Sequence, residues 1–182
     1  MKRVGDNTDD QVVLVNELDR EVGTMDKLAA HTDGALHRAF SVFIFNSAGR
    51  LLLQRRADGK YHSAGLWTNS CCSHPRPGET VEAAAMRRVN EELGITCIMN
   101  HEFSFLYKAD VGNGLHEHEL DHVFFATYDG PVFPDREEVS DVRWMRMNDL
   151  ADDLSTSGEQ YTAWLQLCWP QVWERFMRRL RA

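Results

Sequence analysis

Short segments of the sequence carry side chains that could bind one metal ion together. Cys72 and His74 are two residues apart, as are Glu117 and Glu119, so on extended strands both members of each pair point to one face. Three imidazole nitrogens and two carboxylates suit a divalent ion such as Mn²⁺ or Zn²⁺. Taken singly, each residue is more simply interpreted as a solvated surface group. The candidate ligands are His31, His37, His74, Glu117 and Glu119.

A second set of charged side chains surrounds the segment 87–94. Arg87 and Glu91 are four residues apart, and so are Arg88 and Glu92, so each pair lies one turn apart on a helix. Exposed pairs contribute only a few tenths of a kcal/mol, which is the simpler interpretation. A carboxylate among several cations would also suit a Mg²⁺-bound diphosphate. Further cations lie in or beside loops that lead to this region, namely Lys27, Arg55, Arg56 and Lys60.

Segment 87–94 belongs to a predicted helix. Thr80 is a suitable N-cap and Gly94 a typical stop residue. Between them, apolar residues recur every four positions at Val81, Ala85 and Val89. The aromatic-rich segment 159–181 predicts a final helix, kinked near Pro170, whose arginines form a solvated face.

The candidate ligands lie on or beside predicted strands. Strands are expected at 11–16, 38–46, 51–53, 102–108, 117–128 and 142–145, with a shorter extended stretch at 68–74. Residues 17–21 and 47–49 are expected to form turns, the second of them closing a hairpin, and 59–67 a loop. Strands interleaved with two or three helices predict a mixed sheet flanked by helices.

The composition limits the class of protein. The chain has 182 residues and a formal net charge of -8, which argues against a free-standing nucleic-acid binder. We expect one domain over 1–182, with residues 1–10 flexible. No apolar run approaches the ~20 residues that span a bilayer, and no signal-peptide core follows Met1, so a cytoplasmic location is expected. The 4 cysteines are too few for a disulfide framework, which leaves a thiol free for chemistry.

The segment 73–95 resembles the Nudix box, G-x5-E-x7-R-E-U-x-E-E-x-G-U, where U is an aliphatic residue. The matching residues are Glu79, Arg87, Glu91, Glu92 and Gly94. Two positions differ, because the first glycine is Ser73 and the glutamate after the arginine is Arg88. In Nudix hydrolases the missing carboxylate helps to hold metal, so a cation at this position disfavours pyrophosphate hydrolysis.

Longer motifs resemble one branch, the type 1 isopentenyl-diphosphate Δ-isomerases. They are Ala29-Ala30-His31-Thr32, Trp67-Thr68-Asn69-Ser70-Cys71-Cys72-Ser73-His74-Pro75, Glu92-Leu93-Gly94 and Glu117-His118-Glu119, within a resemblance that runs from about Val12 to at least Trp164. The resemblance implies an α+β fold, a Nudix-like α/β/α sandwich with a mixed β-sheet and N- and C-terminal extensions.

The same resemblance implies a role for each matching residue. The ligands of one protein-bound Mn²⁺ or Zn²⁺ (or Mg²⁺) would be His31, His37, His74, Glu117 and Glu119. Glu92 would help to bind Mg²⁺ on the substrate diphosphate, Cys72 matches the catalytic thiol, and Tyr107 matches a tyrosine beside the acidic pair. The cations against the diphosphate would be Lys27, Arg56, Lys60 and Arg88, and the substrate-binding aromatic would be Trp164, for which a core aromatic is an equal alternative.

The implied reaction interconverts isopentenyl and dimethylallyl diphosphate in isoprenoid biosynthesis. One proton is added to an alkene and another is removed two carbons away, so the transition state approaches a carbocation and water must be excluded. Cys72 and Glu119, on different strands, are the candidates for antarafacial proton transfer, and Tyr107 would hydrogen-bond Glu119. The face of Trp164 or Trp67 would stabilise the cation.

Two other classes of protein stay open. The partial box also allows a Nudix hydrolase of a nucleoside diphosphate derivative, and the histidines alone allow a non-catalytic metal-binding or sensor protein. For the isomerase, the partner is a small allylic or homoallylic diphosphate, with no nucleic acid and no membrane, and the chain is a monomer or homodimer.

Overall fold

A computed structural model describes residues 10–181, so all of the predicted flexible segment 1–10 except Asp10 lies outside the described residues. Within that range the strands join one sheet. They are β1 (Gln11–Val15), β2 (Glu21–Asp26), β3 (His37–Phe45), β4 (Arg50–Arg56), β5 (Trp67–Thr68), β6 (Cys71–Ser73), β7 (Met99–Asp110), β8 (His116–Thr127) and β9 (Val139–Arg146). The helices are α1 (Lys27–Asp33), α2 (Val81–Leu93), α3 (Met147–Thr156) and α4 (Ala163–Arg179), with a short 3₁₀ turn η2 (Gly158–Gln160) before α4.

The sheet is built around β3 and β8, which run parallel to each other. β7 pairs antiparallel with the other edge of β8, while β1, β6 and β4 pair in turn with the second edge of β3. β3 has apolar side chains on both faces, as a strand covered on both sides requires. The sheet is therefore mixed, as the sequence predicted.

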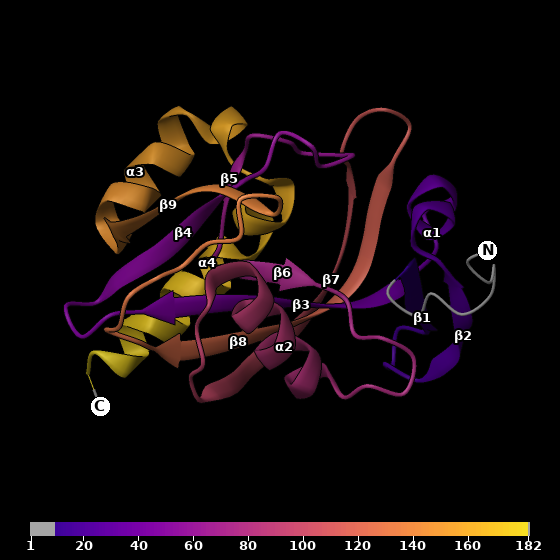
Figure 1. Cartoon of the computed structure of the whole chain (residues 1–182), viewed down its shortest axis with the longest axis horizontal. Helices are drawn as coiled ribbons and strands as arrows, with labels where there is room; N and C mark the ends of the chain where they lie inside the picture. The colour runs from indigo at the N-terminus through magenta and orange to yellow at the C-terminus, as the bar shows by residue number, and fades with distance from the viewer. Residues whose placement is uncertain (1–9, 182) are drawn as a thin grey trace.

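Helices cover both faces of the sheet (Figure 1). On one face α2 packs Ala85, Val89 and Leu93 against Phe40 and Phe124. On the other face the core contains Phe43 and Phe125 of the sheet, together with a buried row from the two C-terminal helices, namely Leu150, Leu165, Cys168, Val172 and Phe176. This arrangement confirms the α/β/α sandwich, with β1, β2 and α1 as the N-terminal extension and α3 and α4 at the C-terminal end.

The predicted helix 80–94 has the expected ends. Thr80 Oγ1 accepts a hydrogen bond from the Ala83 amide, and Gly94 adopts a left-handed conformation with φ 65°. The prediction of two or three helices was wrong, because the described residues form four α-helices. The additional ones include the seven-residue α1 and the ten-residue α3. Short helices depend on tertiary packing rather than on a periodicity that a sequence displays.

The final helix starts later than predicted, and its arginine face is exposed as predicted at Arg178 but packs partly on the sheet at Arg175 and Arg179. It begins at Ala163, because residues 158–160 form the 3₁₀ turn, and it includes Pro170. Arg175 lies 5.9 Å from the Phe103 ring and Arg179 4.9 Å from the Phe125 ring, so both cover aromatic side chains of β7 and β8.

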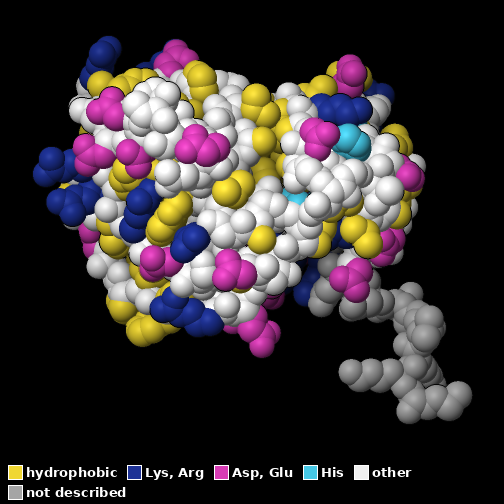
Figure 2. All heavy atoms as spheres, turned by 90° about the horizontal axis from the view of Figure 1, so that it is seen from above, with side chains coloured by type: hydrophobic (Ala, Val, Ile, Leu, Met, Phe, Trp, Pro, Cys, Tyr) yellow, Lys and Arg dark blue, Asp and Glu magenta, His cyan; other side chains and the backbone are white. Residues whose placement is uncertain are grey.

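β4, β7 and β9 are longer than the sequence predicted, whereas β3 and β8 match the predicted strands to within one residue. β1 ends one residue earlier than predicted, and the segment 21–26 is a strand that was not predicted. β2 pairs with β1 and adds an edge to the sheet. On the face drawn in Figure 2, acidic and basic side chains are interspersed. No helix in residues 10–181 is long and apolar enough to cross a membrane.

Candidate active site

The five candidate metal ligands converge at one end of the sheet. Each offers one ligand atom, and these atoms all lie within 4.8 Å of one another. The pairing of β3 with β8 places His37 opposite Glu119, and Glu117 shares the Glu119 face of β8. α1 supplies His31, and the residue directly after β6 supplies His74. The structure thus brings together the whole predicted set.

The hydrogen bonds of two histidines leave the appropriate nitrogens for a metal. His31 Nδ1 lies 2.6 Å from the Lys27 carbonyl oxygen, and His37 Nδ1 lies 2.8 Å from the Ala35 carbonyl oxygen. Because a carbonyl only accepts, each Nδ1 carries the hydrogen and each Nε2 presents a lone pair. Both Nε2 atoms and Glu117 Oε2 are buried without a hydrogen-bond partner. A divalent cation would satisfy all three atoms, so the donor set fits a metal.

Glu119 is held through both of its oxygens. Oε1 lies 2.8 Å from His74 Nε2 and 3.4 Å from His37 Nε2, and Oε2 accepts a 2.6 Å hydrogen bond from the Tyr107 hydroxyl. Burial opposes ionisation of Glu119, but the neighbouring His37 and the hydrogen bond from Tyr107 hold its pKa below the usual value. Burial raises the pKa of Tyr107, so its hydroxyl stays protonated and donates.

Cys72 faces the same cavity as Glu119, together with Tyr107 and Trp164. Burial raises the pKa of the Cys72 thiol to about 12, so the thiol carries its proton at neutral pH. The neighbouring Cys71 is fully buried in the apolar cluster between the sheet and α2. The structure therefore separates two adjacent cysteines, one in the cavity and one in the core.

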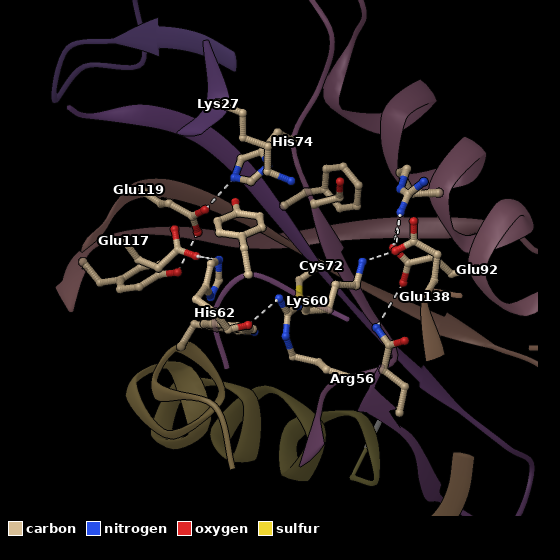
Figure 3. Close-up of a pocket in the computed structure, with 17 residues that line it drawn as sticks. Lys27, Arg56, Lys60, His62, Cys72, His74, Glu92, Glu117, Glu119 and Glu138 are labelled. Carbon is tan, nitrogen blue, oxygen red and sulfur yellow. Dashed lines mark hydrogen bonds and ion pairs between the residues drawn. The ribbon is translucent and has the colours of Figure 1, made fainter. Parts of the chain in front are cut away.

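The four predicted cations also line this cavity, namely Lys27, Arg56, Lys60 and Arg88. Burial and the nearby Lys60 lower the pKa of Lys27, as expected where cations are gathered in a partly enclosed space. Figure 3 shows Glu117 and Glu119 on one side of the cavity and Glu92 on the other, with Cys72 between them in this view.

The two ion pairs of α2 differ in their surroundings. Glu92 is 4% exposed, and its oxygens accept hydrogen bonds from Arg88 at 2.7 Å and from Gln54 at 3.1 Å. Arg88 and Glu92 therefore belong to the cavity. Arg87 instead donates to Glu79 at 2.8 Å and to the more exposed Glu91 at 3.3 Å, as the surface interpretation predicted for this pair.

The two tryptophans proposed from the sequence lie in different places. Trp164 is 3% exposed and lines the cavity, with the Arg56 guanidinium 5.3 Å from its ring centre. Trp67 does not line the cavity, and the Arg143 guanidinium lies 4.1 Å over its ring. Of the two, Trp164 is the aromatic face that a substrate in the cavity would meet.

Sequence reasoning missed several residues that line the cavity, namely Gln54, Tyr61, His62 and Glu138. Glu138 forms ion pairs with Lys60 and Arg88, the second over 3.3 Å. His62 Nε2 lies 3.1 Å from Glu117 Oε1. The only available signal was the position of Tyr61 and His62 directly after Lys60, in a segment predicted simply as a loop.

Comparison with known proteins identifies the family. Residues 35–165 match the NUDIX domain family model. "Isopentenyl-diphosphate Delta-isomerase 2" of Aromatoleum aromaticum is 51% identical over 164 residues, which cover 90% of this chain and 87% of that protein. "Isopentenyl-diphosphate Delta-isomerase" of Pectobacterium atrosepticum is 46% identical over 169 residues, which cover 91% of this chain and 94% of that protein.

Solved structures agree on the fold. The protein DR0079 from Deinococcus radiodurans superposes with a TM-score of 0.68 at 22% identity, over 81% of this chain and 90% of that one. The MutT protein from Methanosarcina mazei Go1 gives a TM-score of 0.62 at 20% identity, over 81% and 96%. The identities of these two proteins support a shared fold alone, whereas the curated relatives are similar in sequence over nearly their whole length. The chain belongs to the isopentenyl-diphosphate Delta-isomerase family and is built on a NUDIX domain.

Proposed function

We propose that this chain interconverts isopentenyl diphosphate and dimethylallyl diphosphate, as the names of its relatives indicate. One observation carries the proposal. The Cys72 thiol and the Glu119 carboxylate, from different strands, face one cavity that is also lined by four cations. A reaction that moves protons on a hydrocarbon attached to a diphosphate needs these groups together.

Two connected spaces provide for the two ends of the substrate. The inner cavity contains Cys72, Glu119, Tyr107 and Trp164, and it adjoins a larger cleft of about 510 Å³. Three of the cations line both spaces, namely Lys27, Lys60 and Arg88. The diphosphate would therefore lie where the spaces meet, and the five-carbon chain would enter the inner cavity, away from water.

Cys72 and Glu119 are proposed to exchange protons with the alkene. One group gives a proton at one carbon while the other removes a proton two carbons away, from opposite faces of the alkene. The Tyr107 hydroxyl holds Glu119 Oε2 in place, so it lies beside the carboxylate that is proposed to exchange a proton with the alkene. The electron-rich face of Trp164 would stabilise the developing positive charge, an effect worth about 2 kcal/mol in a desolvated site.

The site fits divalent metal ions. We propose Mn²⁺ or Zn²⁺, with Mg²⁺ as an alternative, at the His and Glu cluster, and a Mg²⁺ bound by Glu92 that arrives with the diphosphate. When bound, these ions would fix the Glu119 carboxylate and neutralise phosphate charge. The five ligands would hold the first ion, and Glu92, which accepts hydrogen bonds from Arg88 and Gln54, would bind the second.

The hydrolase alternative is less favoured. At the position where the Nudix box has a metal-binding glutamate, Arg88 donates a 2.7 Å hydrogen bond to Glu92 Oε1. A cation here supports binding of a diphosphate rather than activation of a water for its hydrolysis. That the chain forms one domain, acts as a monomer or homodimer, and works in the cytoplasm stays a prediction.

The test is conversion of isopentenyl diphosphate in deuterated water with Mg²⁺ and Mn²⁺ or Zn²⁺ present. Wild type should yield dimethylallyl diphosphate and incorporate deuterium, whereas Cys72→Ser and Glu119→Gln should lose nearly all conversion. Cys97→Ser is the matched control, since Cys97 lies outside the cavity lining. Full activity of either site variant would overturn the assigned roles, and no conversion by wild type would overturn the proposed reaction.

A further inference from the structure

His62 is a buried histidine to which the proposed reaction gives no role. It lies in the loop between β4 and β5 and is 5% exposed. Its ring centre lies 4.6 Å from that of Tyr61, 5.5 Å from that of His31 and 6.0 Å from that of Trp164. The imidazole is thus packed between a candidate metal ligand and the candidate substrate-binding aromatic.

Both ring nitrogens of His62 have polar neighbours. Nε2 lies 3.1 Å from Glu117 Oε1, and Nδ1 lies 3.3 Å from Ser63 Oγ. A carboxylate oxygen only accepts, so at this distance Nε2 would be the nitrogen that donates, and the Ser63 hydroxyl can donate to Nδ1. A neutral imidazole therefore suits both contacts.

The two oxygens of Glu117 have different surroundings. Oε2 lies 3.0 Å from His31 Nε2 and has no hydrogen-bond partner. Oε1 faces His62 on the other side of the carboxylate. His62 is not among the five residues whose ligand atoms cluster within 4.8 Å, so it contacts the ligand shell from outside.

Backbone features of the loop between β4 and β5 fix the position of His62. Ser63 adopts a left-handed backbone conformation with φ 50°, which is uncommon for a residue with a side chain and is retained only where the surroundings fix it. The His62 carbonyl oxygen accepts a 3.2 Å hydrogen bond from Arg56 Nη2, and the Arg56 guanidinium lies over the Trp164 ring. His62 therefore contacts the candidate metal ligand Glu117 through its side chain and the cavity cation Arg56 through its backbone (Figure 3).

We propose that His62 is a positioning residue that donates Nε2–H to Glu117 Oε1 and thereby keeps Glu117 Oε2 directed at the bound metal. This inference rests on the proposed metal centre. A hydrogen bond to the distal oxygen restricts rotation of the carboxylate, so the ligand atom is in place before the ion arrives. Loss of such an outer hydrogen bond typically weakens metal binding about 10- to 100-fold.

The experiment separates the hydrogen bond from ring packing. His62→Phe keeps an aromatic ring but has no donor, whereas His62→Gln keeps an N–H donor but has no ring, and His62→Leu has neither. The affinity of each metal-stripped protein for Mn²⁺ and Zn²⁺ alone is measured by competition with a fluorescent chelator. Circular dichroism of the stripped proteins checks folding, and His101→Leu, which removes an exposed histidine of β7, is the matched control.

We expect His62→Phe and His62→Leu to bind metal about 10- to 100-fold more weakly than wild type, with His62→Gln closer to wild type and His101→Leu unchanged. If His62→Phe misfolds, the comparison of His62→Leu with His62→Gln carries the test. Equal affinity in wild type and the donor-free variants would overturn the role of His62 and leave the metal centre intact. Stronger metal binding by His62→Phe than by His62→Gln would overturn the hydrogen-bonding role and show that ring packing matters instead. Absence of metal binding by wild type would overturn the proposed metal centre itself.

Discussion

Replacing Tyr107 by Phe removes one hydroxyl from the proposed acid–base machinery. That hydroxyl donates to Glu119 Oε2 over 2.6 Å, and Tyr107 is 7% exposed, so water has little access to take its place. A hydrogen bond to a charged group contributes about 1.5–3 kcal/mol. Since 1.36 kcal/mol corresponds to tenfold in rate, a bond maintained in the transition state predicts that kcat falls about 10- to 160-fold. KM should change little, because the Tyr107 hydroxyl contacts Glu119 rather than the cations that would bind the diphosphate.

The assay is steady-state conversion of isopentenyl diphosphate with saturating metal, supported by deuterium incorporation from the solvent. Tyr128→Phe is the matched control, since its hydroxyl donates to the Pro131 carbonyl over 2.9 Å at an exposed position. The control should keep kcat within about twofold of wild type. The reasoning is refuted if Tyr107→Phe, shown to be folded, also keeps kcat within twofold, or if it raises KM alone.

Three further predictions concern stability. Hydrogen bonds from Arg87 lower the pKa of Glu79 from 4.5, so this carboxylate stabilises the fold above pH 4.5 and the contribution disappears as the pH falls through the lower folded value. Urea unfolding of Glu79→Gln should therefore show a lower free energy of unfolding than wild type at pH 7 and a smaller difference in acid. A difference that does not depend on pH would contradict this prediction. Metal at 100 times its Kd should add about 2.7 kcal/mol to the free energy of unfolding, which would raise Tm by about 5–11 °C. The rise in Tm should be smaller in His37→Gln. Leu165→Ala, at a fully buried site, should cost about 2–5 kcal/mol in the same unfolding assay, and a loss below 1 kcal/mol would show that the core relaxes there.

The sequence by itself determined most of the local structure and the membership of the site. Thr80 and Gly94 set the ends of α2, because capping chemistry depends on residues only a few positions apart. Alternation along a strand put Glu117 and Glu119 on one face, and the motif residues predicted the candidate metal ligands, thiol and cations that the structure brings to one cavity. Helix caps and strand alternation involve residues only a few positions apart, so they can be recognised directly in the sequence.

Only the tertiary structure decided which elements meet. The parallel register of β3 and β8 places His37 beside Glu119, and the folding back of the β4–β5 loop brings His62 to Glu117. The same packing formed α1 and α3, which are too short to show a helical period. It also placed Glu138 between Lys60 and Arg88. Such contacts join segments far apart in the chain, and they arise from burial and charge pairing in the whole fold, which no local pattern specifies.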